Sequence, residues 1–168
     1  MKKSKAVLRF LNGTYQSTDG SEPAIGEPWV YVLIDTANKK PLYVAEVGSS
    51  QEYNLIYRLR CSMGELKHPT LCQIHRNAGR TGFLIASSRL DVYCYLLSHC
   101  NAHRRDRRSV ESWIHWLITV RHKVHHEFYF GFSYHVPDQV NQPEAIAIYD
   151  HLSTALGWTP GSSAITSP

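Results

Sequence analysis

Five polar residues of this chain are of types that could do chemistry on a phosphate group: Tyr31, Tyr43, Arg58, His68 and Glu111. An arginine presents a fixed cation and a bidentate fork for non-bridging phosphate oxygens. A single carboxylate, with water and phosphate oxygens in the other positions, is how Mg²⁺ prefers to be held. Together these types suit phosphodiester hydrolysis, which needs an activated water and stabilisation of the charge that develops on the phosphate.

The two tyrosines lie in two short apolar segments that flank a polar turn. Residues 29–35 alternate as a strand does, "TANKKP" supplies turn formers, and a second strand begins at Leu42. A Gly-Ser-Ser break precedes a helix predicted over about 52–64. Arg58 and Arg60 lie about 200° apart around this helix, so only one of them can easily reach a given site.

The rest of the chain predicts further helices and strands. These are a helix over 69–79, strand-like residues over 83–98, a helix over 110–123, an aromatic strand over 127–136 and a helix over 143–158. Ser109 is expected to cap the third of these segments, which places Glu111 in the first helical turn. The order predicts an α/β (α+β) fold with a small, central, mostly antiparallel sheet flanked by helices.

Length and composition predict one domain with its own core. The chain has 168 residues, of which 43% are hydrophobic and 19% charged. We expect an N-terminal leader with one strand over 1–27, the main domain over 28–130, and a C-terminal extension packed on it over 131–168. No segment approaches the roughly 20 apolar residues that span a bilayer. The N-terminal residues lack the long apolar core of a secretory signal, which predicts a cytoplasmic protein without membrane association.

Five motif elements, in this order, resemble the GIY-YIG nuclease superfamily. Trp29-Val30-Tyr31 stand at the Gly-Ile-Tyr positions, and Leu42-Tyr43-Val44 resembles the opening of the second motif. Arg58-Leu59 matches the arginine and apolar residue of the first helix. The segment "HPTLCQIHRNAGRTGF" resembles the one that follows that helix, and Glu111 within "SVESWIHWLI" resembles the glutamate helix.

The resemblance implies a divalent-metal-dependent endonuclease that hydrolyses DNA. It implies that Tyr31 acts as the base or positions the attacking water, with Tyr43 as its hydrogen-bonding partner. Arg58 would bind the phosphate, His68 would assist the phosphate or the water, and Glu111 would hold one Mg²⁺ or Mn²⁺ ion. A tyrosine needs a nearby cation to act as a base, because its free pKa is about 10.

The second motif departs from the family pattern. Ala45-Glu46-Val47 stands between Val44 and Gly48, the structural turn glycine, and Trp29 replaces the first glycine. If these three residues loop out, Tyr43 keeps its place beside Tyr31; if they stay in register, Glu46 takes that place. A catalytically degraded module that binds nucleic acid or protein is therefore the alternative function.

The basic residues indicate a polyanionic partner. The net charge is +4, and basic residues concentrate in two stretches, 58–80 and 103–108. The expected nucleic-acid-binding residues are Arg60, Lys67, Arg76, Arg104, Arg105, Arg107 and Arg108. DNA is the first candidate partner and RNA the second, and the chain is expected to act as a monomer or a homodimer.

Ordinary structural roles compete with each of these interpretations. Tyrosine is common in strands, a lone helix arginine often extends along the surface, and a first-turn glutamate is favourable against the helix dipole. A zinc-stabilised interaction domain is a third function class. It depends on Cys72 with His75 and Cys100 with His103, which lack the spacing of a CxxC pair.

Overall fold

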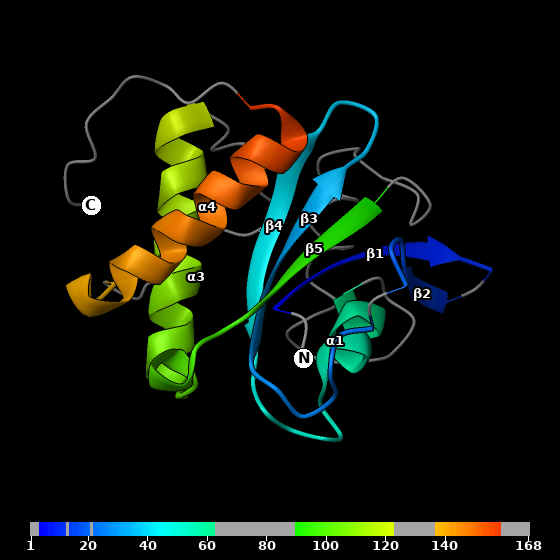
Figure 1. The fold of residues 1–168 in the computed structure, drawn as a ribbon, viewed down its shortest axis with the longest axis horizontal. Helices are drawn as coiled ribbons and strands as arrows, with labels where there is room; N and C mark the ends of the chain where they lie inside the picture. The colour runs from blue at the N-terminus through cyan, green and yellow to red at the C-terminus, as the bar shows by residue number, and fades with distance from the viewer. Residues whose placement is uncertain (1–3, 13, 21, 63–89, 123–136, 159–168) are drawn as a thin grey trace.

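The computed structural model describes residues 4–12, 14–20, 22–62, 90–122 and 137–158 of the chain (Figure 1). In chain order the elements are β1 (Lys5–Leu11), β2 (Thr14–Ser17), β3 (Trp29–Asp35), β4 (Lys40–Val47), α1 (Leu55–Ser62), β5 (Leu90–Leu96), the 3₁₀ turn η2 (His99–Asn101), α3 (Arg104–His122), the 3₁₀ turn η4 (Gln139–Asn141) and α4 (Gln142–Leu156). This arrangement confirms the predicted α+β fold class. The helix predicted over 69–79 and the strand predicted over 127–136 lie outside the described residues.

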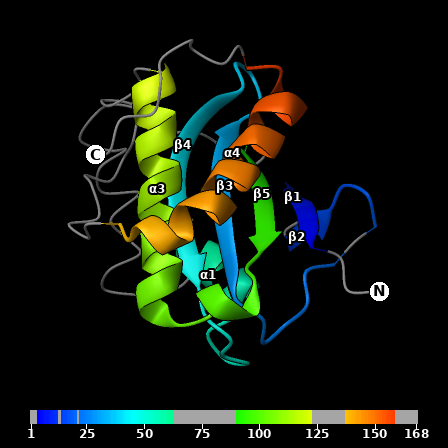
Figure 2. The same ribbon diagram turned by 60° about the vertical axis from the view of Figure 1, so that its left-hand side comes forward.

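One antiparallel sheet joins the five strands in the order β2-β1-β5-β3-β4. Helices α3 and α4 cover one face of the sheet, and α1 lies on the other (Figures 1 and 2). Strand β3 runs between β5 and β4, and all seven of its residues are buried. Within the described residues β4 is an edge strand, and it therefore has a side that no other strand covers.

The sheet separates two hydrophobic cores. The core under α3 and α4 contains Val30, Val32, Ile34, Val44, Tyr95, Val110, Trp113, Ile114, Leu117, Ile118, Ile148, Tyr149 and Leu152. The core under α1 contains Trp29, Tyr31, Leu33, Tyr43, Ala45, Val47, Leu55, Leu59, Val92 and Cys94. Successive residues of β3 enter opposite cores because side chains alternate along a strand. Both predicted tyrosines therefore lie on the α1 face.

The N-terminal segment is part of the sheet. Where one strand was predicted within the leader over 1–27, the structure has two, and β1 pairs with both β2 and β5. Arg9 on β1 donates two hydrogen bonds of 2.7 Å to the carboxylate of Asp91 on β5. This bidentate pair is half exposed on the arginine side, so we expect a modest contribution to stability.

Helix α3 begins earlier than the sequence predicted. The prediction that Ser109 caps it is wrong, because the helix starts at Arg104. Arginine is a good helix former and Asp106 places an acid in the first turn, so the basic stretch continues the helix instead of connecting to it. The Ser109 hydroxyl accepts a hydrogen bond of 2.7 Å from the backbone N–H of Asp138. Glu111 consequently lies about two turns into the helix.

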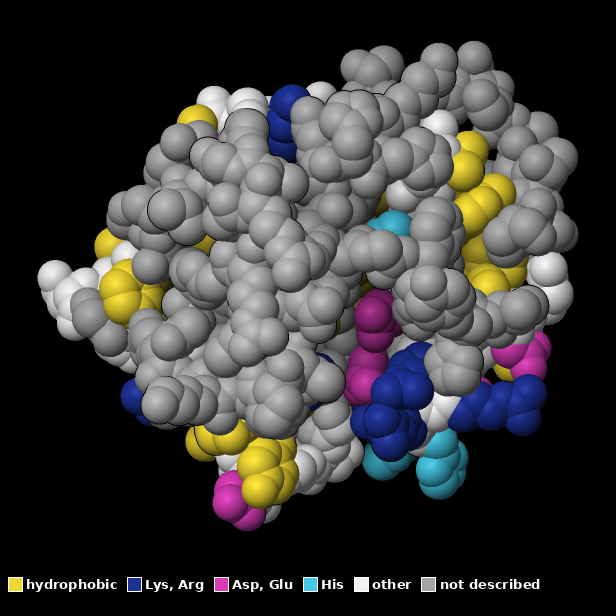
Figure 3. Space-filling model, turned by 180° about the vertical axis from the view of Figure 1, so that it is seen from behind, with side chains coloured by type: hydrophobic (Ala, Val, Ile, Leu, Met, Phe, Trp, Pro, Cys, Tyr) yellow, Lys and Arg dark blue, Asp and Glu magenta, His cyan; other side chains and the backbone are white. Residues whose placement is uncertain are grey.

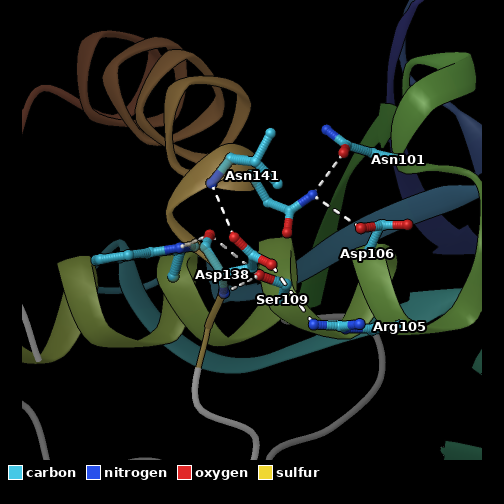
Figure 4. Close-up of polar contacts among 8 residues, drawn as sticks. Asn101, Arg105, Asp106, Ser109, Asp138 and Asn141 are labelled. Atoms are coloured by element: carbon cyan, nitrogen blue, oxygen red, sulfur yellow. Dashed lines mark hydrogen bonds and ion pairs between the residues drawn. The ribbon is translucent and has the colours of Figure 1, made fainter.

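A polar network attaches the start of α4 to the start of α3 (Figure 4). The Asn141 side-chain amide donates to Asn101 Oδ1 at 2.6 Å and to Asp106 Oδ1 at 3.2 Å. The Glu144 carboxylate accepts hydrogen bonds from the Ser98 N–H and hydroxyl at 2.8 Å, and from the Asn101 amide. These contacts fix α4 against α3 and the residues before it. None of the described helices is long and apolar enough to cross a membrane.

Replacing Glu144 by alanine is expected to lower the free energy of unfolding by about 1–2 kcal/mol, because the buried Asn101 amide loses a charged acceptor. Urea unfolding followed by tryptophan fluorescence measures the change. The control is Asp150→Ala on the same helix, whose carboxylate is exposed and 3.9 Å from Arg121. It should change stability by less than about 0.5 kcal/mol. Equal losses in the two variants would contradict an anchoring role for Glu144.

Candidate active site at the edge of strand β4

The β3–β4 hairpin keeps Ala45, Glu46 and Val47 in register. Tyr31 pairs with Ala45 and Val30 with Glu46, so these residues do not loop out. The register shift lies further along, where Leu33 pairs with Tyr43 and Ile34 with Pro41, which makes Leu42 the extra residue of a bulge. Of the two alternatives left open by the sequence, the in-register one is therefore observed.

Tyr43 nevertheless keeps its place beside Tyr31. Because Ala45 pairs with Tyr31 and side chains alternate, Tyr43 lies on the same face and one diagonal step away. The two rings meet edge to face, with centroids 6.2 Å apart. Glu46 does not replace Tyr43, since its side chain leaves the strand on the opposite, α3 face, where it meets Arg107.

The two tyrosines have different surroundings. Burial, followed by the nearby Tyr31 and Glu111, raises the pKa of Tyr43 well above its ordinary value, while Arg58 acts in the opposite direction. Tyr43 is therefore protonated at neutral pH and suited to donate a hydrogen bond, not to accept a proton as a base. Tyr31 is completely buried. The assignment of Tyr31 as the base stays a prediction.

Arg58 reaches the end of β4 from α1. Leu55 and Leu59 bury the inner face of this helix, and Arg58, three residues after Leu55, lies at the border of that face. Its Nη2 donates to the carbonyl oxygen of Glu46 at 3.4 Å, and its buried Nε has no partner among the described residues. Arg60 is exposed. The structure thus places Arg58, and not Arg60, beside the hairpin.

Glu111 approaches the same strand end from the other face of the sheet. Burial, and next the charge of Glu46, raise the pKa of its carboxyl group to about 8, while Arg108 and Arg58 lower it. In the described part of the chain the Glu111 carboxylate accepts no hydrogen bond and forms no ion pair. A carboxylate that is withdrawn from water without such partners is destabilising unless a cation or a proton accompanies it.

Arg107 binds Glu46, the middle residue of the three that interrupt the second motif. Its Nε lies 2.5 Å from Glu46 Oε2, and its Nη1 donates to the carbonyl of Ala102. The guanidinium passes so close to Gly48 that a Cβ atom there would be 2.9 Å from Nη2. Gly48 was predicted as a turn residue; its lack of a side chain also makes room for Arg107.

Apart from Arg60 and Arg107, described above, the predicted nucleic-acid-binding residues fall into three groups. Lys67 and Arg76 lie outside the described residues, as does the predicted catalytic His68. Arg104 and Arg105 are exposed, and Arg105 Nη2 is 3.6 Å from Asp138 in a solvent-exposed contact. Arg108 is half-buried and acts electrostatically on Glu111. Figure 3 shows basic and acidic side chains gathered next to each other on the rear face of the molecule.

Sequence reasoning missed the role of Arg107, which it grouped with the DNA-binding arginines. The signal that could have revealed it is the spacing of four residues between Arg107 and Glu111, which puts both on one face of a helix. That inference needed the helix to begin at Arg104. With Ser109 as the predicted cap, Arg107 falls in a connection between elements, where its side chain has no predictable direction.

Two carboxylates act electrostatically on one another at this strand end. Glu111 and Glu46 are the two carboxylates near each other, and no group of three or more His, Cys, Asp or Glu residues forms in the described ranges. Mg²⁺ is commonly held by one or two carboxylates, with water and phosphate oxygens completing its shell. Of these two carboxylates Glu46 is bound to Arg107, which leaves Glu111 as the residue that would hold the ion; Mg²⁺ or Mn²⁺ at Glu111 stays a prediction.

Comparisons with protein-family models, with curated proteins and with solved structures find no match to this chain.

Proposed function

We propose that this chain is a divalent-metal-dependent endonuclease that hydrolyses DNA phosphodiester bonds at the end of β4. The observation that carries the proposal is the meeting of Arg58 and Glu111 at this strand end. They come from opposite faces of the sheet, and both act electrostatically on Tyr43. The observed element order agrees with the resemblance to the GIY-YIG nucleases, in which the hairpin, the arginine helix and the glutamate helix follow in this sequence.

Each side chain has a role that its surroundings support. The Arg58 guanidinium, which forms no close ion pair among the described residues, binds the non-bridging phosphate oxygens. Protonated Tyr43 donates a hydrogen bond to the phosphate or the attacking water, and the Tyr31 ring packs edge to face against the Tyr43 ring. Glu111 holds Mg²⁺ or Mn²⁺, which when bound supplies Lewis-acid stabilisation and a more acidic water. Exposed Arg104 and Arg105 contact the DNA backbone.

A binding module without catalysis is the second candidate. The complete burial of Tyr31 favours it, because a base must reach the proton that it removes. In this alternative the basic residues bind nucleic acid and the strand end does no chemistry. The cytoplasmic location and the choice between monomer and homodimer stay predictions.

Incubation with supercoiled plasmid, linear duplex, single-stranded DNA and RNA tests the proposal. Each substrate is offered with Mg²⁺, with Mn²⁺ and with EDTA. We expect nicking of DNA in either metal and none in EDTA. A parallel preparation of Arg58→Ala controls for a contaminating nuclease. If no nucleic acid is cut while gel-shift binding persists, the binding module replaces the enzyme.

A further inference from the structure

Among the ion pairs of the described residues, the one between Glu46 and Arg107 is set apart by its burial. Its side chains are 13% exposed on the arginine and 11% on the glutamate. In the pairs of Arg9 with Asp91 and of Arg105 with Asp138, at least one partner is more than 40% exposed. A buried ion pair contributes little net stability, because desolvation offsets the attraction between the charges. The expected benefit of this pair is therefore a fixed geometry.

Glu46 is contacted from both faces of the sheet. Its backbone carbonyl accepts the hydrogen bond from Arg58 on the α1 face. Its carboxylate binds Arg107 on the α3 face. One residue of the edge strand thus connects the arginine of the proposed site to the helix that carries the glutamate.

Arg107 connects that helix to β4 through its contact with Glu46. It precedes Glu111 by four residues, so the two side chains leave α3 on the same face, about one turn apart. Arg107 also donates to the Ala102 carbonyl, which lies just before the first turn of the helix. Gly48 leaves the space that the guanidinium needs against the strand.

We propose that Glu46 and Arg107 form a positioning pair that holds Arg58 and Glu111 at a fixed separation across the end of β4. Neither residue touches the substrate: they act through the two that do. Arg107, predicted as a DNA-binding residue, has this positioning role instead. The inference rests on the proposed nuclease function. Within that function, Glu46 of the irregular second motif has a positioning role.

Single-turnover cleavage and DNA affinity of Glu46→Gln and Arg107→Met test the pair. We expect the cleavage rate to fall about 10–100-fold while the Kd for DNA changes less than about threefold. Gly48→Ala should act in the same direction, because its methyl group displaces the guanidinium. The double variant Glu46→Arg with Arg107→Glu reverses both charges. Its cleavage rate should be at least tenfold higher than that of the single variants. Asp91→Asn removes the ion pair with Arg9, away from the site, and should leave the rate unchanged.

Two results would overturn the positioning role. One is a loss of DNA affinity in Arg107→Met without a change in the cleavage rate, which indicates direct DNA binding. The other is a lower unfolding midpoint with an unchanged rate in the folded protein, which indicates a purely structural pair.

A measurement without cleavage separates this inference from the proposed function. In the wild-type protein the Arg58 Nε–H should give a narrow NMR signal, because the side chain is held in one position. In Glu46→Gln that signal should shift and broaden, whether or not the protein cuts DNA. An unchanged Arg58 signal contradicts the positioning pair. Absence of cleavage by the wild-type protein, with the Arg58 signal changed as expected, contradicts only the nuclease function.

Discussion

Replacing Arg58 by alanine is expected to lower the rate of metal-dependent DNA cleavage about 10²–10³-fold, the usual cost of removing one preorganised group that stabilises transition-state charge. Arg58 lies at the end of β4, donates only a long hydrogen bond of 3.4 Å to Glu46, and has a buried Nε without a partner among the described residues. Its guanidinium is therefore available to phosphate oxygens. The same substitution should leave the fold intact, since no ion pair within the described ranges depends on it.

Arg60→Ala is the matched control for this prediction. Arg60 has the same charge and lies two residues away on the same helix, but it is exposed. We expect its loss to change the cleavage rate less than about threefold and to weaken DNA binding slightly. Single-turnover rates at saturating protein compare the variants. Equal effects of the two substitutions would show that Arg58 contributes only general positive charge.

Replacing Glu111 by glutamine is expected to abolish cleavage, by about 10³-fold or more, and to stabilise the metal-free protein at alkaline pH. The folded-state pKa of Glu111 is raised from an ordinary value of 4.5 to about 8. As the pH rises from 4.5 to 8, the unfolded chain releases this proton while the folded protein retains it, so the wild-type protein loses stability across this window. Glutamine carries no proton to release and avoids that loss.

The free energy of unfolding of Glu111→Gln, relative to that of the wild-type protein, should therefore increase as the pH rises. It should be close to zero at pH 4, grow between pH 4.5 and 8, and reach roughly 2–4 kcal/mol at pH 9. Urea unfolding in EDTA over this pH range measures it. The control is Glu52→Gln, whose exposed carboxylate lies before α1 and should give no such trend. A difference that is constant with pH would show that the Glu111 carboxyl group is not withdrawn from water.

The fold could be predicted to a large extent because hydrophobic alternation is unambiguous in this chain. The strand predicted over 29–35 coincides with β3, and the last helix was placed within two residues of α4 at each end. The start of α3 could not be predicted, because the basic stretch 103–108 is equally typical of a connecting loop and of an exposed helical turn. The hydrogen bond between Ser109 and Asp138 links residues far apart in sequence, which no local pattern reports.

The candidate site could be predicted in its residue types but not in its geometry. The sequence indicated Arg58, Glu111 and the two tyrosines, and the structure places Arg58, Glu111 and Tyr43 within electrostatic reach of one another. The position of Glu46 depended on a bulge at Leu42, where a single extra residue sets which side chains of β4 face each core. Pairing partners across a sheet determine that bulge, and they are not encoded in the local spacing.

We propose that the end of β4 is a metal-dependent site for phosphodiester cleavage built around Glu111. Nicking of supercoiled plasmid by the wild-type protein, by Glu111→Gln and by Glu52→Gln, in Mg²⁺ or Mn²⁺ and in EDTA, tests it most directly. We expect nicking by the wild-type protein and Glu52→Gln in metal only, and none by a folded Glu111→Gln protein that still binds DNA. Nicking by Glu111→Gln at the wild-type rate would contradict it.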